Sequence, residues 1–492
     1  EVVVNVDIDA AVTQACKEWI PTVATAASDS RFRLVTDNAF EWLQRQPHQD
    51  YDVIIIDFTD SPHHGFWTKE VYATLKSLLR PPHGMLVQNV DTFRGRDTLH
   101  QIFALHAEVF ESRTYLLSAL IPDYFSPYHI ALSTMGLSSL QANETFWNAQ
   151  GVEATYYSME VHESILEAAP RAVLEMMGLS VPTKPKALGS HYQEGHTKVD
   201  LAEPHPAAGR AEVASTLETV HGKLDVWSTC QQENCRGMDL ADSIEVHPFS
   251  AFRDEALLLP AMNILGAKAQ RVLILGGGDG GIATLLMNFP RVQRVVLVDA
   301  REDLIDVAKR WFPQRSAGLI DTRTQIVRTD IVHWLQNAFA EFDLIIFQSV
   351  HRSWDCTTRT ACYPRTKMFF KKLRSLLSSH GLLVQDAGSL ARPSHFFKLH
   401  ALHSEFFTSV RPLSYATLED DEHISRVRVQ LPPRLALLSS AGQDALEVDW
   451  QSWADLNLQT SFYHPSMHNA LFTLPHALAR ELDTLESRKE RS

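Results

Sequence analysis

The sequence predicts an α/β protein in which a domain built on a mostly parallel, helix-covered sheet occurs twice. Three observations predict this class. Apolar β-branched runs alternate with amphipathic helical segments, the whole series of segments recurs in the same order in the second half, and one apolar strand runs into a glycine-rich turn and a helix. Alternation of strands and helices is typical of right-handed βαβ units, which place their strands in parallel.

The clearest part of the repeat is a helix that ends in a similar motif in both halves. Lys17–Pro21 recurs as Lys309–Pro313, and each segment follows a β-branched run that ends in an acid. The apolar positions before the two motifs have the spacing i, i+3, i+4, i+7: Val12, Ala15, Cys16 and Trp19 in the first half, and Leu304, Val307, Ala308 and Trp311 in the second. We therefore expect both helices to pack one apolar face on a sheet.

Further matched segments follow in register, and they set the expected domain boundaries. Residues 52–56 and 343–347 are the matching buried strands, and each is followed by a Leu-rich helix and a second strand. The expected organisation is a first domain at 1–180, a Pro- and Gly-containing linker at 181–214, a small β subdomain at 215–268 and a second domain at 269–486. The chain opens inside an apolar strand without an initiator Met. We therefore expect a fragment whose first domain lacks its first strand and glycine loop.

Composition narrows the functional classes. Hydrophobic residues make up 45% and charged residues 21%, a balance able to bury a large core. The net charge of −14 argues against a nucleic-acid or anionic membrane partner and is compatible with a cationic substrate. The five cysteines lack zinc spacing and a disulfide framework, and there is neither a signal peptide nor a membrane-length apolar run. We expect a cytoplasmic protein without a metal site.

The second half carries a candidate nucleoside site. An apolar strand at 271–275 runs into the glycine turn 276–281, where a ligand can approach the backbone closely. Asp299 ends the next strand, where ribose hydroxyls are usually held, and Asp330 ends the following one, within reach of an adenine amino group. Together with Asp279 in the turn, these acids would repel a pyrophosphate, so they favour an adenosine ligand without phosphates.

These residues resemble the nucleotide motifs of the spermidine and spermine synthases, the polyamine aminopropyltransferase family. The resemblance implies two Rossmann-like domains of the S-adenosylmethionine methyltransferase type. It implies decarboxylated S-adenosylmethionine as co-substrate, no permanently bound cofactor, and a role for Asp279 in holding the aminopropyl ammonium. The residues that it assigns to nucleoside binding are Asp7 (ribose) and Asp37 (adenine) in the first copy, and Gly276, Gly278, Asp279, Gly280, Asp299 and Asp330 in the second.

The first half carries the candidate chemistry. Transfer to an amine needs a proton acceptor, because an alkylamine of pKa about 10 is neutral in only about one molecule in a thousand at pH 7. Asp57 and Asp60 leave a buried strand into a loop, where two acids could equally be turn caps. The resemblance implies Asp57 as the base, Asp60 as a substrate contact, and Tyr124 as part of the amine pocket. It also matches Tyr156, Tyr157 and His162 to the start of a closing helix.

The second copy departs from the family at the matching positions. Gln348 stands in place of Asp57, and His351, followed by Arg352, in place of Asp60. Arg253 and Asp254 are further departures, in a segment that usually lines the amine pocket, and the acidic run 419–422 replaces the tyrosine segment. An amide accepts a proton poorly, and a guanidinium opposes a diamine. We therefore expect a degenerate second copy that binds nucleoside or supports the first.

The leading hypothesis is an aminopropyltransferase that uses a di- or polyamine and an adenosyl nucleoside, with catalysis in the first copy. The two copies would pair as an intramolecular pseudo-dimer, or the protein would form a homodimer. Two alternatives stay open: an S-adenosylmethionine-dependent methyltransferase on the same fold, and a non-catalytic polyamine- or nucleoside-binding protein.

Overall fold

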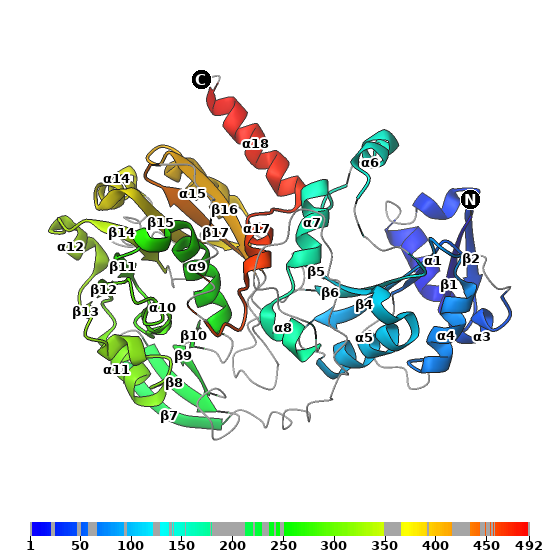
Figure 1. Cartoon of the computed structure of the whole chain (residues 1–492), viewed down its shortest axis with the longest axis horizontal. Coiled ribbons are helices and arrows are strands. Elements are labelled where there is room, and N and C mark those ends of the chain that lie inside the picture. The colour runs from blue at the N-terminus through cyan, green and yellow to red at the C-terminus, as the bar shows by residue number, and fades with distance from the viewer. Residues whose placement is uncertain are drawn as a thin grey trace. The chain divides into compact units, whose positions relative to one another are not determined.

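The structure is a computed structural model, and its cartoon is shown in Figure 1. It describes residues 2–20, 25–46, 51–57, 66–92, 96–121, 128–136, 140, 142–152, 154–177, 179, 212–219, 222–228, 236–240, 243–246, 250–348, 366–390, 393–415, 433–442, 448, 453, 456 and 458–490. Contacts divide the chain into two compact units. Unit 1 comprises Glu1–Asp91, Thr98–Leu116 and Ile130–Ser139, and unit 2 comprises Thr92–Asp97, Leu117–His129 and Leu140–Ser492.

The first copy forms two separate sheets. Strands β1 (Val3–Asp7) and β2 (Phe32–Thr36) pair in parallel with each other. The other sheet has the order β3-β4-β6-β5, with β3 parallel to β4, and consists of β3 (Val53–Ile56), β4 (Met85–Thr92), β5 (Thr114–Ala119) and β6 (Tyr128–Thr134). The helices between these strands are α1 (Ala10–Trp19), α3 (Ala39–Leu43), α4 (Lys69–Leu78) and α5 (Arg96–Phe110).

The second copy forms one seven-stranded sheet with the order β13-β12-β11-β14-β15-β17-β16. Its strands are β11 (Arg271–Leu275), β12 (Arg294–Val298), β13 (Thr324–Val327), β14 (Phe342–Phe347), β15 (Leu377–Ser389), β16 (Ser409–Tyr415) and β17 (Arg434–Ser440). Strands β11 to β15 pair in parallel, and β17 is antiparallel to both of its neighbours. The helices are α9 (Ser250–Leu265), α10 (Gly281–Leu286), α11 (Glu302–Trp311), α12 (Ile331–Gln336), α14 (Lys367–Ser375), α15 (Ser394–His403), α17 (His468–Leu471) and α18 (His476–Glu490).

The two strand orders confirm the predicted α/β class and the predicted repeat. If β1 to β6 are matched to β12 to β17, the first-copy order is the second-copy order without β11. Among the described residues no first-copy strand takes the place of β11, and the hydrogen-bonded order breaks at that place, between β1 and β3. Strand β11 thus accounts for the difference between one continuous sheet and two separate ones.

Helices α1 and α11 show the effect of that difference on packing. In α11 the apolar face is covered, with Leu304, Val307 and Ala308 buried. The same expectation for α1 is wrong: no residue of α1 is buried, and Trp19 is 77% exposed. Because the β1–β2 sheet is not bonded to the rest of the first-copy sheet, it offers α1 too small a surface to cover its apolar face.

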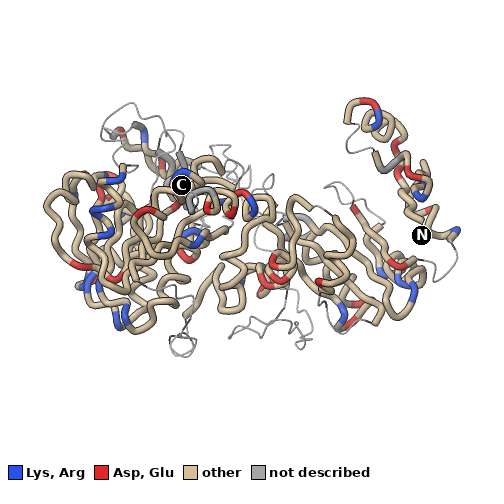
Figure 2. The backbone as a smooth tube through the Cα atoms, turned by 90° about the horizontal axis from the view of Figure 1, so that it is seen from above, with Lys and Arg blue, Asp and Glu red and all other residues tan. Residues whose placement is uncertain are grey.

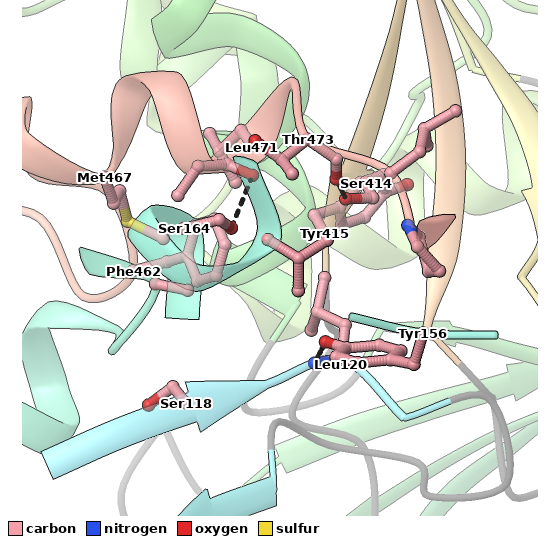
Figure 3. Close-up of a pocket in the computed structure, with 15 residues that line it drawn as sticks. Ser118, Leu120, Tyr156, Ser164, Ser414, Tyr415, Phe462, Met467, Leu471 and Thr473 are labelled. Carbon is pink, nitrogen blue, oxygen red and sulfur yellow. Dashed lines mark hydrogen bonds between the residues drawn. The ribbon is translucent and has the colours of Figure 1, made fainter. Parts of the chain in front are cut away.

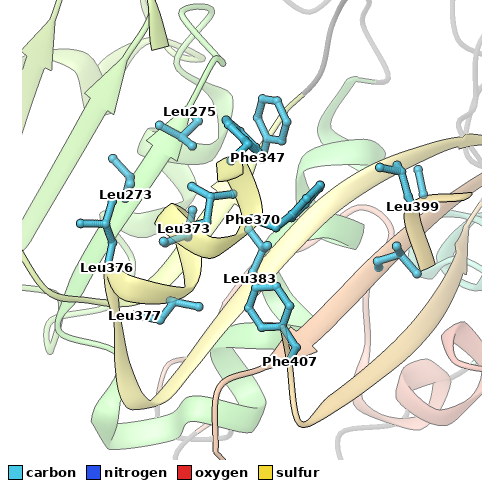
Figure 4. Packing of buried hydrophobic residues seen from close by; sticks show 14 of the residues in the cluster. Leu273, Leu275, Phe347, Phe370, Leu373, Leu376, Leu377, Leu383, Leu399 and Phe407 are labelled. Atoms are coloured by element: carbon cyan, nitrogen blue, oxygen red, sulfur yellow. The ribbon is translucent and has the colours of Figure 1, made fainter. Parts of the chain in front are cut away.

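The core of the second copy lies around its central strands (Figure 4). Every residue of β14 is buried, as is typical of a central parallel strand with helices on both faces. The cluster in the figure combines strand, helix and loop residues such as Leu273, Phe347, Phe370 and Phe407. The burial of these large apolar side chains is the main source of stability for such a sheet.

A buried histidine network occurs in both copies at matching positions. In the first copy, His106 Nδ1 lies 2.8 Å from Ser133 Oγ and Nε2 lies 3.1 Å from Gln88 Oε1. In the second copy, His403 makes the same two contacts, at 2.7 Å to Ser439 Oγ and at 2.9 Å to Gln385 Oε1. Burial lowers the pKa of His106 and that of His403 to about 3, so both rings are neutral.

A small antiparallel sheet precedes the second copy, as predicted for part of residues 215–268. Its order is β10-β9-β8-β7, from β7 (Glu212–Thr219), β8 (Gly222–Ser228), β9 (Arg236–Leu240) and β10 (Ser243–Val246). Its apolar face packs on α11, where Leu224 and Val246 share a cluster with Leu304. The predicted linker lies outside the described residues except at its end, where β7 begins.

Charge is spread along the chain rather than concentrated. Figure 2 shows short stretches of Lys and Arg interspersed with Asp and Glu. Among the helices in the described ranges, none combines the length and the apolar character that a membrane span requires.

Candidate functional site

The glycine turn after β11 has the backbone of a ligand-binding loop. Gly276, Gly277 and Gly280 have φ values of +83°, +77° and +86°, which only glycine adopts without strain. A Cβ atom on Gly276 would lie 2.6 Å from the carbonyl oxygen of Gln348. The turn therefore needs glycine both for its dihedral angles and for the close approach of the neighbouring strand end.

Asp299 is tied to this turn. Its carboxylate accepts the N–H of Gly278 and that of Arg301, both at 2.9 Å. Burial raises the pKa of Asp299, and the charge of Arg301 partly opposes this. The structure therefore brings together the predicted residues Gly278 and Asp299, whereas Asp330 is exposed and accepts the N–H of His333 at 3.0 Å as the cap of α12.

Asp279 lies in a buried cluster with two arginines. Its Oδ2 accepts from Arg315 Nη2 at 2.6 Å and Nε at 3.1 Å, and from Arg253 Nη2 at 3.4 Å. Arg315 also donates to Asp254 at 2.5 Å. Burial alone would raise the pKa of Asp279, but the two guanidinium charges outweigh it and the pKa is lowered. No pattern in the sequence predicts this contact, because Arg315 follows α11 and is far from the turn in the chain.

Gln348 occupies the strand end that matches Asp57, and it is buried. It directly follows β14 and is 6% exposed. Its Nε2 donates to Asp254 Oδ1 at 3.4 Å, and its Oε1 has no hydrogen-bond partner among the described residues. The amide therefore packs between the glycine turn and the arginine cluster.

Asp57 has the opposite environment. It directly follows β3, is exposed, and accepts from Asn89 Nδ2 at 2.8 Å. Asn89 lies within the neighbouring strand β4, so two adjacent strands position the carboxylate. The predicted partners Asp60 and Tyr124 lie outside the described residues, as do His351, Arg352 and the acidic run 419–422.

Asp7 and Asp37 end the two paired strands of the first copy. Asp7 Oδ1 accepts the N–H of Asp9 at 2.8 Å, the same i+2 contact that Asp299 makes with Arg301. Asp37 accepts the N–H of Asn38 at 2.9 Å and forms an ion pair with Arg45. The strand ends are adjacent, because the N–H of Asp37 donates to the carbonyl of Asp7 at 3.0 Å.

Within unit 2, the segments that follow the two sheets are matched and contact each other. Tyr157 OH lies 2.8 Å from His162 Nδ1 at the start of α7 (Met159–Glu167), and Tyr463 OH lies 2.7 Å from His468 Nδ1. The contacts between the segments are reciprocal backbone hydrogen bonds. Arg171 and Ala172 in α8 (Arg171–Met176) donate to Phe462 and Ser461 at 3.0 and 2.8 Å, and His476 and Ala477 donate to Tyr156 and Thr155 at 3.1 and 2.8 Å.

A mainly apolar pocket lies where these segments meet (Figure 3). Ser118, Leu120 and Tyr156 line it from the first copy, and Ser414 and Tyr415 in β16 line it from the second. The hydroxyl oxygen of Tyr156 accepts the N–H of Leu120 at 3.1 Å, and the hydroxyl of Ser414 donates to the carbonyl of Thr473 at 2.9 Å. The reciprocal backbone hydrogen bonds of residues 171–172 and 476–477 are of the kind found at an isologous interface between two like domains.

Parallel strands that end in a glycine turn and in successive acids are typical of a Rossmann-like α/β protein. Comparison with known families specifies this class further. The model of the spermine/spermidine synthase domain matches residues 1–142 and again 257–418. The chain belongs to the spermine/spermidine synthase family and contains two copies of the family's domain.

Individual relatives carry matching names. The chain is 27% identical over 224 residues to a polyamine aminopropyltransferase of Agathobacter rectalis, covering 45% of this chain and 74% of the relative. It is 30% identical over 206 residues to one of Thermoanaerobacter sp., covering 42% and 68%. The solved spermidine synthase of Thermotoga maritima is similar at 19% identity and a TM-score of 0.47, covering 55% of this chain and 88% of that one.

Proposed function

We propose that this chain is a polyamine aminopropyltransferase whose chemistry takes place in the first copy. It transfers an aminopropyl group from decarboxylated S-adenosylmethionine to a di- or polyamine. The observation that carries the proposal is the contrast at one strand end: the first copy presents an exposed carboxylate, Asp57, where the second has a buried amide, Gln348.

The exposure of Asp57 and its hydrogen bond to Asn89 support its proposed role as proton acceptor for an attacking amine. Its Oδ1 accepts from Asn89 at 2.8 Å, which orients the carboxylate. In the reaction the amine nitrogen forms a bond to the carbon beside the sulfonium, the carbon–sulfur bond breaks, and its electron pair stays on sulfur. Before the attack, the ammonium form of the acceptor gives one proton to Asp57, which leaves the nitrogen with the electron pair that forms the new bond. Asp60 and Tyr124 are proposed to hold the acceptor amine.

The nucleoside contacts of the first copy are proposed to come from Asp7 and Asp37. Both acids end adjacent parallel strands, as Asp299 and Asp330 do in the second copy. The shared i+2 contact of Asp7 and Asp299 supports an equivalent role for these two. The second copy is proposed to be degenerate for transfer, because its base position is an amide.

The two copies are further proposed to form an intramolecular pseudo-dimer. Four backbone hydrogen bonds support this, since residues 171–172 and 476–477 donate to matching carbonyls of the other segment. The location in the cytoplasm stays a prediction from the cysteine usage.

Product analysis of the full chain tests the proposal. The protein is incubated with decarboxylated S-adenosylmethionine and a panel of di- and polyamines, and the elongated amine is quantified by mass spectrometry. Asp57→Asn should lower the transfer rate by about 10²–10⁴-fold, because the amide cannot accept the proton.

The matched control is Asp52→Asn, at the other end of the same segment. Asp52 is an exposed acid paired with Arg80 at 2.7 Å, so its loss should leave the rate unchanged. Methylation of an acceptor by S-adenosylmethionine without any aminopropyl product would support the methyltransferase alternative. Turnover that survives Asp57→Asn would contradict the assignment of the base.

A further inference from the structure

The second copy contains a cation of its own where the resemblance places the ammonium of the donor. Asp279 is the residue assigned to that ammonium, and its Oδ2 is held by Arg315 at 2.6 Å. The side chains of Asp279 and Arg315 are 5% and 15% exposed. Arginine stays charged at any pH that a folded protein meets, so this contact does not open by deprotonation.

The cluster is balanced in charge. Asp254 and Asp279 supply two carboxylates, and Arg253 and Arg315 supply two guanidinium groups, all within 3.4 Å of a partner. Separating one member of a buried ion pair leaves an uncompensated charge and is strongly unfavourable. An incoming ammonium would therefore have to displace Arg315 from Asp279 and leave the guanidinium buried beside another cation.

The strand end beside this cluster, where the first copy has Asp57, carries no charge in the second copy. The donor carries a second charge on its sulfonium, which lies beside the base position in the proposed reaction. Gln348 stands at that position in the second copy and offers an amide instead of a carboxylate. Its Oε1 is a buried acceptor without a partner among the described residues, a hydrogen-bonding position that carries no charge.

The nucleoside half of the second site is nevertheless intact. The glycine turn keeps the backbone that allows close approach, and Asp299 is fixed beside it through Gly278 at 2.9 Å. Asp330 remains exposed at the next strand end. In the second copy, Asp279 is thus paired with Arg315 and is not available to the cationic aminopropyl group, while the residues assigned to ribose and adenine are retained.

We infer that Arg315 is a specificity-determining residue that fills the ammonium position of the second copy, so that this copy binds an adenine nucleoside with an uncharged thioether at its 5′ carbon and rejects the cationic donor. This inference rests on the proposed function. Aminopropyl transfer converts the sulfonium into a neutral thioether, because the electron pair of the broken carbon–sulfur bond stays on sulfur. The ligand class is therefore that of the nucleoside product.

The test measures binding at the second copy without using activity. Hydrogen–deuterium exchange of the full chain is followed in peptides that cover 271–286 during titration with 5′-methylthioadenosine or decarboxylated S-adenosylmethionine. The thioether should protect the glycine turn at concentrations at least about tenfold below those at which the donor does. Asp299→Asn should remove this protection.

Substitution of Arg315 should reverse the preference. Arg315→Met removes the shorter of the two ion pairs of Asp279 and leaves the 3.4 Å contact with Arg253. The affinity of the second copy for the donor, measured by protection of these peptides, should rise by at least about tenfold. Because this variant leaves two buried acids with one arginine, the double variant Asp254→Asn, Arg315→Met, which keeps one acid and one arginine, provides a second test without the charge imbalance. Arg310→Met, an exposed position on α11, is the matched control and should change neither titration.

Two results would overturn the inference: equal or stronger protection of the wild-type turn by the donor, or no protection by either nucleoside. Neither depends on turnover. Failure of the proposed function would instead appear as absent aminopropyl product, with the preference of the second copy unchanged.

Discussion

The two copies keep the same scaffold and differ at the residues that face a ligand's charge. Both have a neutral buried histidine bonded to a serine and a glutamine on neighbouring strands. At the strand end after β3 and β14, however, one copy has an exposed acid and the other a buried amide. Packing residues have thus been retained in both copies, while the charged positions have not.

The comparison also separates stability from catalysis. The second copy has the continuous sheet, the glycine turn and the larger core, yet its carboxylates are neutralised by its own arginines. The first copy has a divided sheet and an exposed helix α1, yet it holds the proposed base. The charge at the strand ends is therefore the basis on which we propose that the first copy is active.

The largest expected effect on stability comes from the glycine turn, which only the second copy contains among the described residues. Gly276→Ala combines a left-handed φ with a 2.6 Å approach to the Gln348 backbone, so it should reduce the free energy of unfolding of that copy by about 2–5 kcal/mol. Urea unfolding followed by hydrogen exchange in β11 measures this. Gly151→Ala is the control, since it has φ of +62° but no atom within 4 Å of the added Cβ, and it should cost only about 1 kcal/mol.

An effect that is smaller per pH unit should appear equally in both copies as the pH falls. The folded pKa of His106 and that of His403 are about 3, below the unfolded value of 6.5, so each ring's contribution is complete above pH 6.5 and is lost as the pH falls towards 3. Each histidine should steepen the loss of stability by about 1.4 kcal/mol per pH unit in that window. Exchange rates in α5 and α15 across this range measure it. A pH response confined to one copy would show that the two networks are not equivalent.

The smallest effect concerns a hydroxyl that distinguishes the networks. Tyr72 donates to Gln88 Oε1 at 2.7 Å in the first copy, and Phe370 stands at the matching position of the second. Tyr72→Phe should therefore reduce the free energy of unfolding by about 1 kcal/mol, since Gln88 keeps its contact with His106. Thermal denaturation measures the change. A loss several times larger would indicate that His106 alone does not satisfy Gln88.

The repeat and the α/β class could be predicted because they depend on periodic patterns in the chain. Residues 52–56 and 343–347 became β3 and β14 almost to the residue, and the matched helices α1 and α11 formed where their spacing indicated. Gly278 and Asp299 could be expected to meet because the carboxyl ends of neighbouring parallel strands lie at one edge of the sheet.

What could not be predicted depends on contacts between distant parts of the chain. Arg315 reaches Asp279 from a turn after α11, and no local pattern marks an arginine that will be buried. The exposure of α1 likewise depends on a neighbouring strand rather than on its own sequence. Burial of Gln348 follows from the arginine cluster that it packs against. The identity of Gln348 was visible in the sequence, but its environment was not.

The reciprocal hydrogen bonds of residues 155–156 and 461–462 have one more consequence. Two like domains that meet through such a contact as separate molecules would come apart on dilution, whereas domains joined in one polypeptide remain at a high effective concentration however dilute the sample. Within one chain the two partners also need not be identical. In the pseudo-dimer that we propose, one copy can therefore differ in its binding residues while the other still has a matching surface to contact.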